Sequence, residues 1–289
     1  DLVRYQLDLS GNKPEFITLP ETIDSQIAQF KGRVDLLVGG PPCQGHSTLN
    51  NKTRGFDPRN LLYYAMPAFA IALKIPTLLI ENVRNISAAS ENVVQNTRKT
   101  LESYGYKTEE LVVDASRFGT AQTRYRHFLL CHQGVGTNFS DLMSAMQVPP
   151  LSFDSINAGL PSLITQSDTL ERAAELSEKN KARIDFLHEN DIDDLPNSER
   201  PDCHKDGHTY PSVYGRIRSN TPMGTITTGF MSPGRGRYIH PHERRCITIR
   251  EAARIQGFPD WYFQPADELG LVKTHLTKII GDAVPSQMV

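Results

Sequence analysis

The sequence predicts a doubly wound α/β fold, in which helices cover a mostly parallel sheet, together with a second, smaller domain. In the first half of the 289 residues, short apolar runs alternate with longer mixed segments, as strands alternate with helices in such folds. From about Gly134 the chain becomes rich in turn-forming residues, which indicates a domain boundary. Hydrophobic and charged residues make up 38% and 22% of the chain, which is ordinary for a globular protein.

The expected strands and helices follow one another along the first half of the chain. Strands are predicted at "VDLLVGG", "TLLIENV", "TEELVVDAS" and "RYRHFLLCH", and helices at "LLYYAMPAFAIALK" and "VVQNTRKTLESYG". In parallel sheets ligands gather beyond the carboxyl ends of the strands. Cys43 and the segment Glu81–Val83 fall at such ends, so both are placed for chemistry.

We divide the chain into a first, catalytic domain over 1–145, a second domain over 146–262 and a return segment over 263–289. An acidic amphipathic helix is expected near 169–189. A second helix begins after Thr248, because Glu251 three residues later completes a capping box, and ends at Gly-Phe-Pro. The chain begins without methionine and stops in "GDAVPSQMV", so we expect a longer full-length protein.

Composition excludes several classes of protein. The four cysteines are too few and too scattered for a disulfide framework, and no signal peptide or membrane-spanning apolar run is present, so we expect a cytoplasmic protein. The net charge of −2 argues against a wholly basic nucleic-acid coat but leaves a local basic patch open. The segment "CHKDGH" lacks a second pair of ligands, so no metal site is expected.

Three short motifs carry candidate reactive groups. In "LLVGGPPCQGHS" a rigid turn presents Cys43, which is either a nucleophile or a small buried cysteine that caps a strand. Glu81 follows a buried strand, where a carboxyl group serves as a general acid or as a capping or ion-pairing residue. In "QTRYRHFLL" the side chains of Arg124 and Arg126 are expected on one strand face, to bind a carbonyl oxygen or phosphate or to form surface salt bridges.

The ordered series Gly-Gly-Pro-Pro-Cys-Gln, Glu-Asn-Val and Gln-x-Arg-x-Arg resembles the cytosine-5 DNA methyltransferases. Further matches are "GFDPRNLLYY", "GTITTGF…GRGRYIHP…RCITIREAARIQGFPD" and the closing "GDAVP". The resemblance covers most of the chain except about 146–205. It implies a Rossmann-like methyltransferase fold whose second domain recognises the target sequence.

The resemblance also implies an activity, namely methyl transfer from S-adenosylmethionine to carbon 5 of a flipped-out cytosine in duplex DNA. Cys43 would attack carbon 6 of the ring, and Glu81 would donate a hydrogen bond or proton at nitrogen 3. Arg126 would hold the cytosine O2, while Arg124 would steady Glu81 or the target phosphate.

Binding residues are carried over by the same motifs. Cofactor contacts are expected from Pro41, Leu62, Asp282 and Ala283. DNA contacts are expected from Pro41, Gln44, Ser47, Arg59, Asn82, Thr228, Arg235 and Arg237. The segment 44–53 would be a mobile lid over the target base. In the second domain the first part is acidic and the second part is rich in arginine, which predicts a solvent-facing and a DNA-facing half.

Two departures from the family pattern concern the cofactor. The chain contains no glycine-rich loop with a following acidic residue, and Asp282 stands where the family usually has asparagine. We expect the missing segment in a longer monomeric protein, unless a partner chain supplies it in trans. Under this interpretation the protein acts on nucleoid DNA as part of a restriction-modification system.

Two rival functions stay open at this point. A cytosine-5 methyltransferase of tRNA would keep the same catalytic motifs, although the Cys-Phe-Thr signature of that branch is absent here. A catalytically inactive DNA-binding homologue would agree with the missing cofactor loop. Against it, a pure scaffold has no chemical reason to keep Cys43, Glu81 and Arg126.

Overall fold

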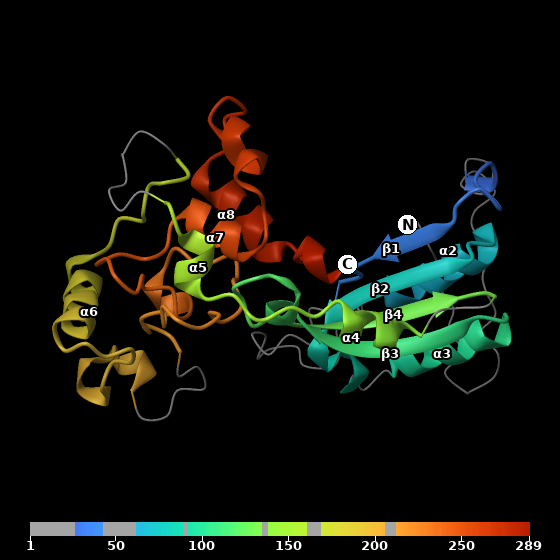
Figure 1. The fold of residues 1–289 in the computed structure, drawn as a ribbon, viewed down its shortest axis with the longest axis horizontal. Coiled ribbons are helices and arrows are strands. Elements are labelled where there is room, and N and C mark those ends of the chain that lie inside the picture. The colour runs from blue at the N-terminus through green and yellow to red at the C-terminus, as the bar shows by residue number, and fades with distance from the viewer. Residues whose placement is uncertain (1–26, 43–61, 89–91, 135–137, 161–168, 206–211) are drawn as a thin grey trace. The chain divides into compact units, whose positions relative to one another are not determined.

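The structure, a computed structural model, describes residues 27–42, 62–88, 92–134, 138–160, 169–205 and 212–289 (Figure 1). The chain divides into two compact units. The first unit comprises Asp1–Val113 and Tyr125–Met146, and the second comprises Asp114–Arg124 and Gln147–Val289. The change of unit at Met146 falls beside the predicted boundary, whereas the proposed return segment 263–289 clusters with the second unit.

The first unit has the mixed α/β fold that the sequence predicts, built on a four-stranded sheet with the order β1-β2-β4-β3. Its strands are β1 (Leu36–Gly39), β2 (Thr77–Val83), β3 (Lys107–Asp114) and β4 (Tyr125–His132). Strands β1 and β2 are parallel, with Leu36 opposite Thr77. The two strands that end in the proposed reactive motifs are therefore neighbours that point the same way.

Strand β4 corrects the expectation of a mostly parallel sheet, because it runs antiparallel to β2. A parallel neighbour needs a crossover connection of about a dozen residues or more, usually with a helix. The connection that precedes β4 contains only a 3₁₀ turn, Ala115–Phe118, before the strand begins at Tyr125. The described sheet is thus mixed, with one parallel and one antiparallel pairing around β2.

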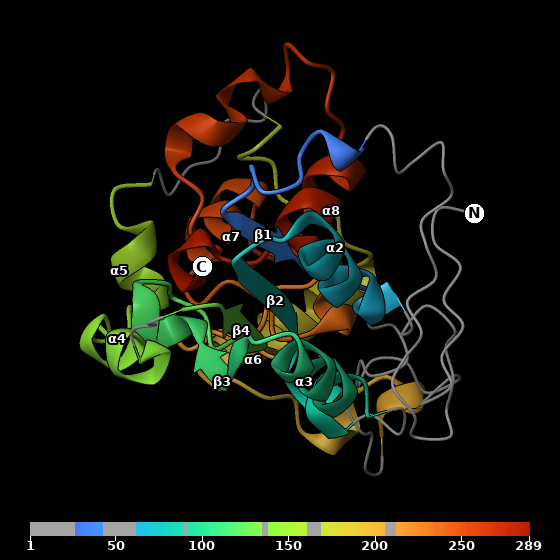
Figure 2. The ribbon, with the colours of Figure 1, turned by 90° about the vertical axis from the view of Figure 1, so that its right-hand side faces the viewer.

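One face of this sheet is covered by helices α2 (Ala65–Leu73) and α3 (Val93–Ser103), which Figure 2 shows on the same side of the strands. Their apolar side chains form a core with Leu78, Ile80 and Leu129 of the sheet. Helix α4 (Phe139–Ala145) ends the first unit, capped by the side chain of Asn138. Packing on this face fixes the strands whose ends carry the candidate site.

The second unit contains α5 (Phe153–Asn157), α6 (Glu178–Glu189), α7 (Ile249–Ile255) and α8 (Lys273–Asp282). The predicted capping box is confirmed, since the Thr248 side chain accepts from the Glu251 N–H and the Glu251 side chain accepts from the Thr248 N–H. The chain leaves α7 at Gly257, whose φ of +89° suits glycine.

The helix expected over 169–189 is wrong in its first half. Helix α6 begins at Glu178, where the Ser177 side chain caps it by accepting from the Asn180 N–H. An N-cap serine stops the helix from continuing toward its N-terminus, because the serine itself has an extended backbone. Residues 169–177 are turn and irregular structure.

No helix in the described ranges combines the length and the hydropathy of a membrane span.

A buried ion network holds the start of α7. Arg245 donates from Nη1 and Nη2 to both carboxylate oxygens of Glu251, at 2.8 and 2.7 Å, and Glu251 is 5% exposed. His240 lies 3.2 Å from the same carboxylate. Burial alone would raise the pKa of Glu251, but hydrogen bonds and charge from Arg245 and His240 lower it to about 2.

Replacing Arg245 with methionine is expected to destabilise the protein by about 3–5 kcal/mol, because the Glu251 carboxylate is then buried without its partner. Urea unfolding at pH 7 measures the loss. The double variant Arg245→Met/Glu251→Leu should recover most of it, and no recovery would contradict this account. Because the folded pKa of Glu251 lies below its ordinary 4.5, the stabilisation is present above pH 4.5 and lost toward pH 2.

Candidate active site

The centre of the candidate site in the first unit is an ion pair between Glu81 and Arg126, with Nε 2.9 Å from Oε1. The register between β2 and β4 explains it. Glu81 lies opposite Phe128, and Arg126 lies opposite Val83, so the two charged side chains are diagonal neighbours on one sheet face. Both side chains are mostly buried, at 16% and 15% exposure. The strand pairing therefore places a carboxylate and a guanidinium side by side.

The turn after β1 lies against the end of β2. Asn82 donates from Nδ2 to the Pro41 carbonyl oxygen at 3.1 Å, and its Oδ1 accepts from the Val83 N–H at 2.8 Å. Asn82 is 2% exposed. At Gly40 an added Cβ would lie 3.1 Å from Oε2 of Glu81, so glycine leaves room for the carboxyl group. This backbone leads directly to Cys43 in the sequence.

Cys43, together with Gln44, Ser47 and Arg59, lies outside the described residues, so their predicted roles stay predictions. Two other cysteines are poor nucleophiles. Burial raises the pKa of the Cys131 and Cys246 thiols to about 12, which leaves them protonated at neutral pH.

Arg124, the first arginine of the motif, directly precedes β4 and belongs to the second unit. It is 3% exposed, and its Nη1 donates to the Ile226 carbonyl oxygen at 3.0 Å. The backbone N–H of Arg124 is held as well, because it donates to Oδ1 of Asp114 at 3.2 Å. The guanidinium thus holds backbone of the second unit, a role that the sequence did not indicate.

The four residues predicted to bind the cofactor fall in different surroundings. Leu62 is 47% exposed in the turn before α2. The Pro41 carbonyl accepts from Asn82, and the Ala283 carbonyl accepts from Gln256 at 2.6 Å. Asp282 is exposed and lies 2.6 Å from Lys278 on the surface of α8.

The predicted DNA contacts of the second unit also differ from one another. Thr228 and Arg235 are exposed, as a DNA contact requires. Arg237 instead pairs with Asp194, and its Nη1 donates to the carbonyl oxygens of Asp193 and Arg216, each at 2.9 Å. Structural contacts therefore occupy the guanidinium of Arg237.

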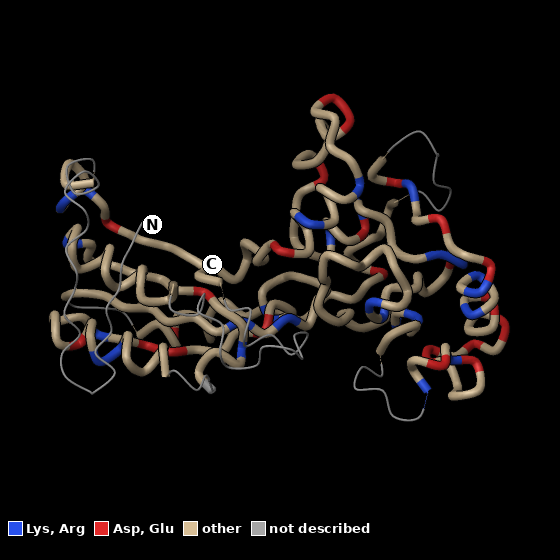
Figure 3. Tube along the Cα trace, turned by 180° about the vertical axis from the view of Figure 1, so that it is seen from behind, with Lys and Arg blue, Asp and Glu red and all other residues tan. Residues whose placement is uncertain are grey.

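The acidic first part and the arginine-rich second part of the second domain are not separated in space, and which of them faces DNA stays a prediction. Acidic and basic positions are interleaved around α6 and the segment that follows it (Figure 3). Arg216 pairs with Asp191 at 2.8 Å, and Arg244 pairs with Asp185 at 2.8 Å. Oppositely charged segments that are far apart in the sequence fold against each other, so they neutralise one another locally.

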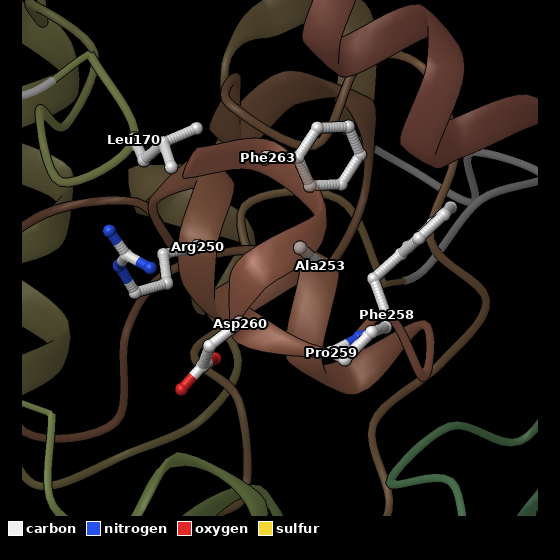
Figure 4. Close-up of a pocket in the computed structure, with 7 residues that line it drawn as sticks. All are labelled: Leu170, Arg250, Ala253, Phe258, Pro259, Asp260 and Phe263. Atoms are coloured by element: carbon white, nitrogen blue, oxygen red, sulfur yellow. The ribbon is translucent and has the colours of Figure 1, made fainter. Parts of the chain in front are cut away.

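A small hollow lies beside α7, lined by Leu170, Arg250, Ala253, Phe258, Pro259, Asp260 and Phe263 (Figure 4). Its charged residues already have partners: Arg250 pairs with Glu171, and Asp260 lies 2.6 Å from Arg254. Paired charges and little open space make it a poor site for a nucleotide or cofactor.

Solved structures share this fold. A prophage-encoded E. coli protein assigned to DNA modification methyltransferases aligns with a TM-score of 0.60 and 23% identity, over 93% of this chain and 80% of that one. The Dnmt2 methyltransferase of S. pombe aligns with a TM-score of 0.56 and 14% identity, over 90% and 77%. The fold is therefore that of a methyltransferase.

The chain belongs to the C-5 cytosine-specific DNA methylase family, whose model matches residues 13–289. The type II methyltransferase M1.BsuMI of Bacillus subtilis is 38% identical over 273 residues, which are 93% of this chain and 62% of that protein. The type II methylase M.HgiDII of Herpetosiphon aurantiacus is 31% identical over 263 residues, 86% and 72% of the two chains. The matched part of the chain thus spans about three fifths of the length of M1.BsuMI.

Proposed function

We propose that this protein transfers a methyl group from S-adenosylmethionine to carbon 5 of a cytosine in duplex DNA. The observation that carries the proposal is the Glu81–Arg126 ion pair at 2.9 Å, in a chain that belongs to the cytosine-specific family. A guanidinium and a carboxyl group that has taken up a proton both donate hydrogen bonds, and nitrogen 3 and O2 of cytosine both accept them, so the two side chains suit that edge of the base.

In this mechanism the Cys43 thiolate adds to carbon 6 of the cytosine, and the double bond between carbons 5 and 6 opens as the carbon–sulfur bond forms. Its electrons shift toward carbon 5 and nitrogen 3, while Glu81 donates a hydrogen bond or proton at nitrogen 3 and Arg126 holds O2. S-adenosylmethionine, when bound, supplies the methyl group that carbon 5 accepts. Loss of the proton from carbon 5 and departure of the sulfur from carbon 6 then free the enzyme.

The residues present fit part of this cofactor. Leu62 offers an exposed apolar side chain, and Asp282 offers an exposed carboxylate that would exchange its surface ion pair with Lys278 for a cationic amine or sulfonium. The carbonyl oxygens of Pro41 and Ala283 already accept hydrogen bonds from Asn82 and Gln256. We therefore keep Leu62 and Asp282 as side-chain contacts.

The target base would be flipped out of the duplex, because carbon 6 of a stacked base is inaccessible to a nucleophile. Residues 146–262 would form the target-recognition domain, with exposed Thr228 and Arg235 among its contacts. The relatives named as type II methyltransferases support a role in restriction and modification.

The proposal is tested by incubating the full-length protein with labelled S-adenosylmethionine and either duplex DNA or tRNA. Label is expected in DNA alone, at cytosines that bisulfite sequencing then locates. Transfer to tRNA alone would identify an RNA enzyme, and binding of DNA without transfer would identify an inactive homologue; both results contradict the proposal.

A further inference from the structure

The backbone N–H and the carbonyl group of one buried residue, Ile226, are both held by side chains of the Gln-x-Arg motif. Oε1 of Gln122 accepts from the Ile226 N–H at 2.8 Å, and Nη1 of Arg124 donates to the Ile226 carbonyl oxygen at 3.0 Å. Gln122, Arg124 and Ile226 are 0%, 3% and 0% exposed. A buried peptide held at both groups is fixed in position and in orientation.

The residues on either side of Ile226 are held as well. The hydroxyl of Tyr238 donates to the Thr225 carbonyl oxygen at 3.0 Å and accepts from the Thr227 N–H at 3.2 Å. At Gly281 of "GDAVP" an added Cβ would lie 2.3 Å from the Thr228 nitrogen, so the backbones touch there. The segment 225–228 is thus held by contacts at each of its four residues.

Gln122 is itself fixed by a second buried glutamine. Its Nε2 donates to Oε1 of Gln256, and Gln256 in turn donates to the carbonyl oxygens of Ile280 and Ala283, at 2.9 and 2.6 Å. Since every polar group of both amides has a role, neither side chain can rotate by 180° without losing contacts. The chain of contacts leaves Gln122 with one orientation toward Ile226.

The anchored segment has two exposed threonines, and the hydroxyl of one of them, Thr225, donates to the Thr123 carbonyl oxygen at 3.0 Å. Thr225 and Thr228 are exposed, whereas Ile226 between them is fully buried. Threonine recognises a base edge through its hydroxyl or, at thymine, through its methyl group, and such contacts require a fixed distance and angle. The backbone that sets this geometry is held by Gln122 and Arg124.

We infer that Gln122 and Arg124 are positioning residues that fix the segment 225–228, and so determine which DNA sequences are methylated. This inference rests on the proposed function. It gives Arg124 a different task from phosphate binding, and it gives a task to Gln122, the motif residue to which the sequence assigned no role.

Amide hydrogen exchange of the DNA-free, full-length protein tests the contacts directly. In Gln122→Met the amides of 225–228 are expected to exchange about tenfold faster or more, because the Ile226 N–H loses its acceptor. The matched control is Arg117→Met in the same unit, whose side chain donates to Gln147 on the surface. Unchanged exchange at 225–228 in Gln122→Met would overturn the inference.

Methylation of duplexes with random bases around a central cytosine tests the consequence. Arg124→Met is expected to weaken the sequence preference about tenfold at one or more positions, while Arg124→Lys, which keeps a donor for the Ile226 carbonyl, retains most of it. The salt dependence of kcat/KM should keep its slope in Arg124→Met. A slope reduced by about 0.9 with an unchanged preference would instead make Arg124 a phosphate contact.

The two proposals fail separately. A wild-type protein that methylates no cytosine in the random duplexes contradicts the proposed function, whatever its exchange rates. Active variants with unaltered exchange and unaltered sequence preference contradict the positioning role alone. If Gln122→Met does not fold, the comparison of Arg124→Lys with Arg124→Met still decides the outcome.

Discussion

Replacing Cys43 with serine is expected to abolish methyl transfer, with a loss of about 10⁴-fold or more. A few per cent of an ordinary thiol is ionised at neutral pH and is strongly nucleophilic, whereas a serine hydroxyl is not ionised without a dedicated base. Carbon 5 of cytosine cannot accept a methyl group until the sulfur has added to carbon 6. DNA binding should persist, because the substitution removes no basic side chain.

The measurement is a covalent trap. Duplex DNA with 5-fluorocytosine at the target base should form an adduct that survives denaturing electrophoresis, since fluorine cannot leave carbon 5 as a proton does. Cys43→Ser should form none. Cys203→Ser replaces an exposed cysteine of the second unit and serves as the matched control, with full adduct expected. An undiminished adduct in Cys43→Ser would exclude this nucleophile.

Local patterns predicted several parts of the fold well. The Thr248–Glu251 spacing located the start of α7, because a capping box depends on residues three apart in sequence. The alternation of apolar and mixed segments predicted the strands and helices of the first unit. The direction of β4 was missed, because strand direction depends on what the preceding connection can span, and that connection lacks a crossover helix.

Long-range charge pairing could not be predicted. Arg244 and Asp185 are far apart in the sequence, so their charges count as separate clusters until the fold brings them together. The same limit applies to Glu81 and Arg126, for which the sequence predicted separate chemical roles but no contact with each other. Their ion pair depends on the register that sets Val83 opposite Arg126. Registers of this kind follow from packing across the whole sheet.

Gln122 and Gln256 carried no signal strong enough to assign them a task. A glutamine in a sequence is expected on the surface, and both are nearly inaccessible in the structure, at 0% and 1% exposure. Buried amides are tolerated when all their hydrogen bonds are made. Their value therefore shows only when donors and acceptors from four separate segments of the second unit are seen together.

Replacing Glu81 with glutamine is expected to lower the single-turnover rate of methylation by about 10²–10⁴-fold. An amide keeps the size of the side chain and can donate a weak hydrogen bond, but it cannot supply a proton at nitrogen 3. Arg126→Met should cost about 10²–10³-fold, because a donor to the developing charge is lost. Rapid-quench assays with a saturating duplex measure both rates.

If Glu81 and Arg126 act as one unit across β2 and β4, the double variant should methylate almost as fast as the slower of the two single variants. The reason is that the effects of substituting groups that act together are not additive. The control is Arg84→Met, which removes a guanidinium that lies 5.0 Å from the Tyr125 ring in the same unit. Thermal unfolding of each variant separates catalysis from stability, because removing one partner of a mostly buried ion pair also destabilises the protein. A Glu81→Gln protein that keeps its methylation rate within threefold would remove the carboxyl group from the mechanism. Rate losses that multiply in the double variant would show that the two side chains act independently.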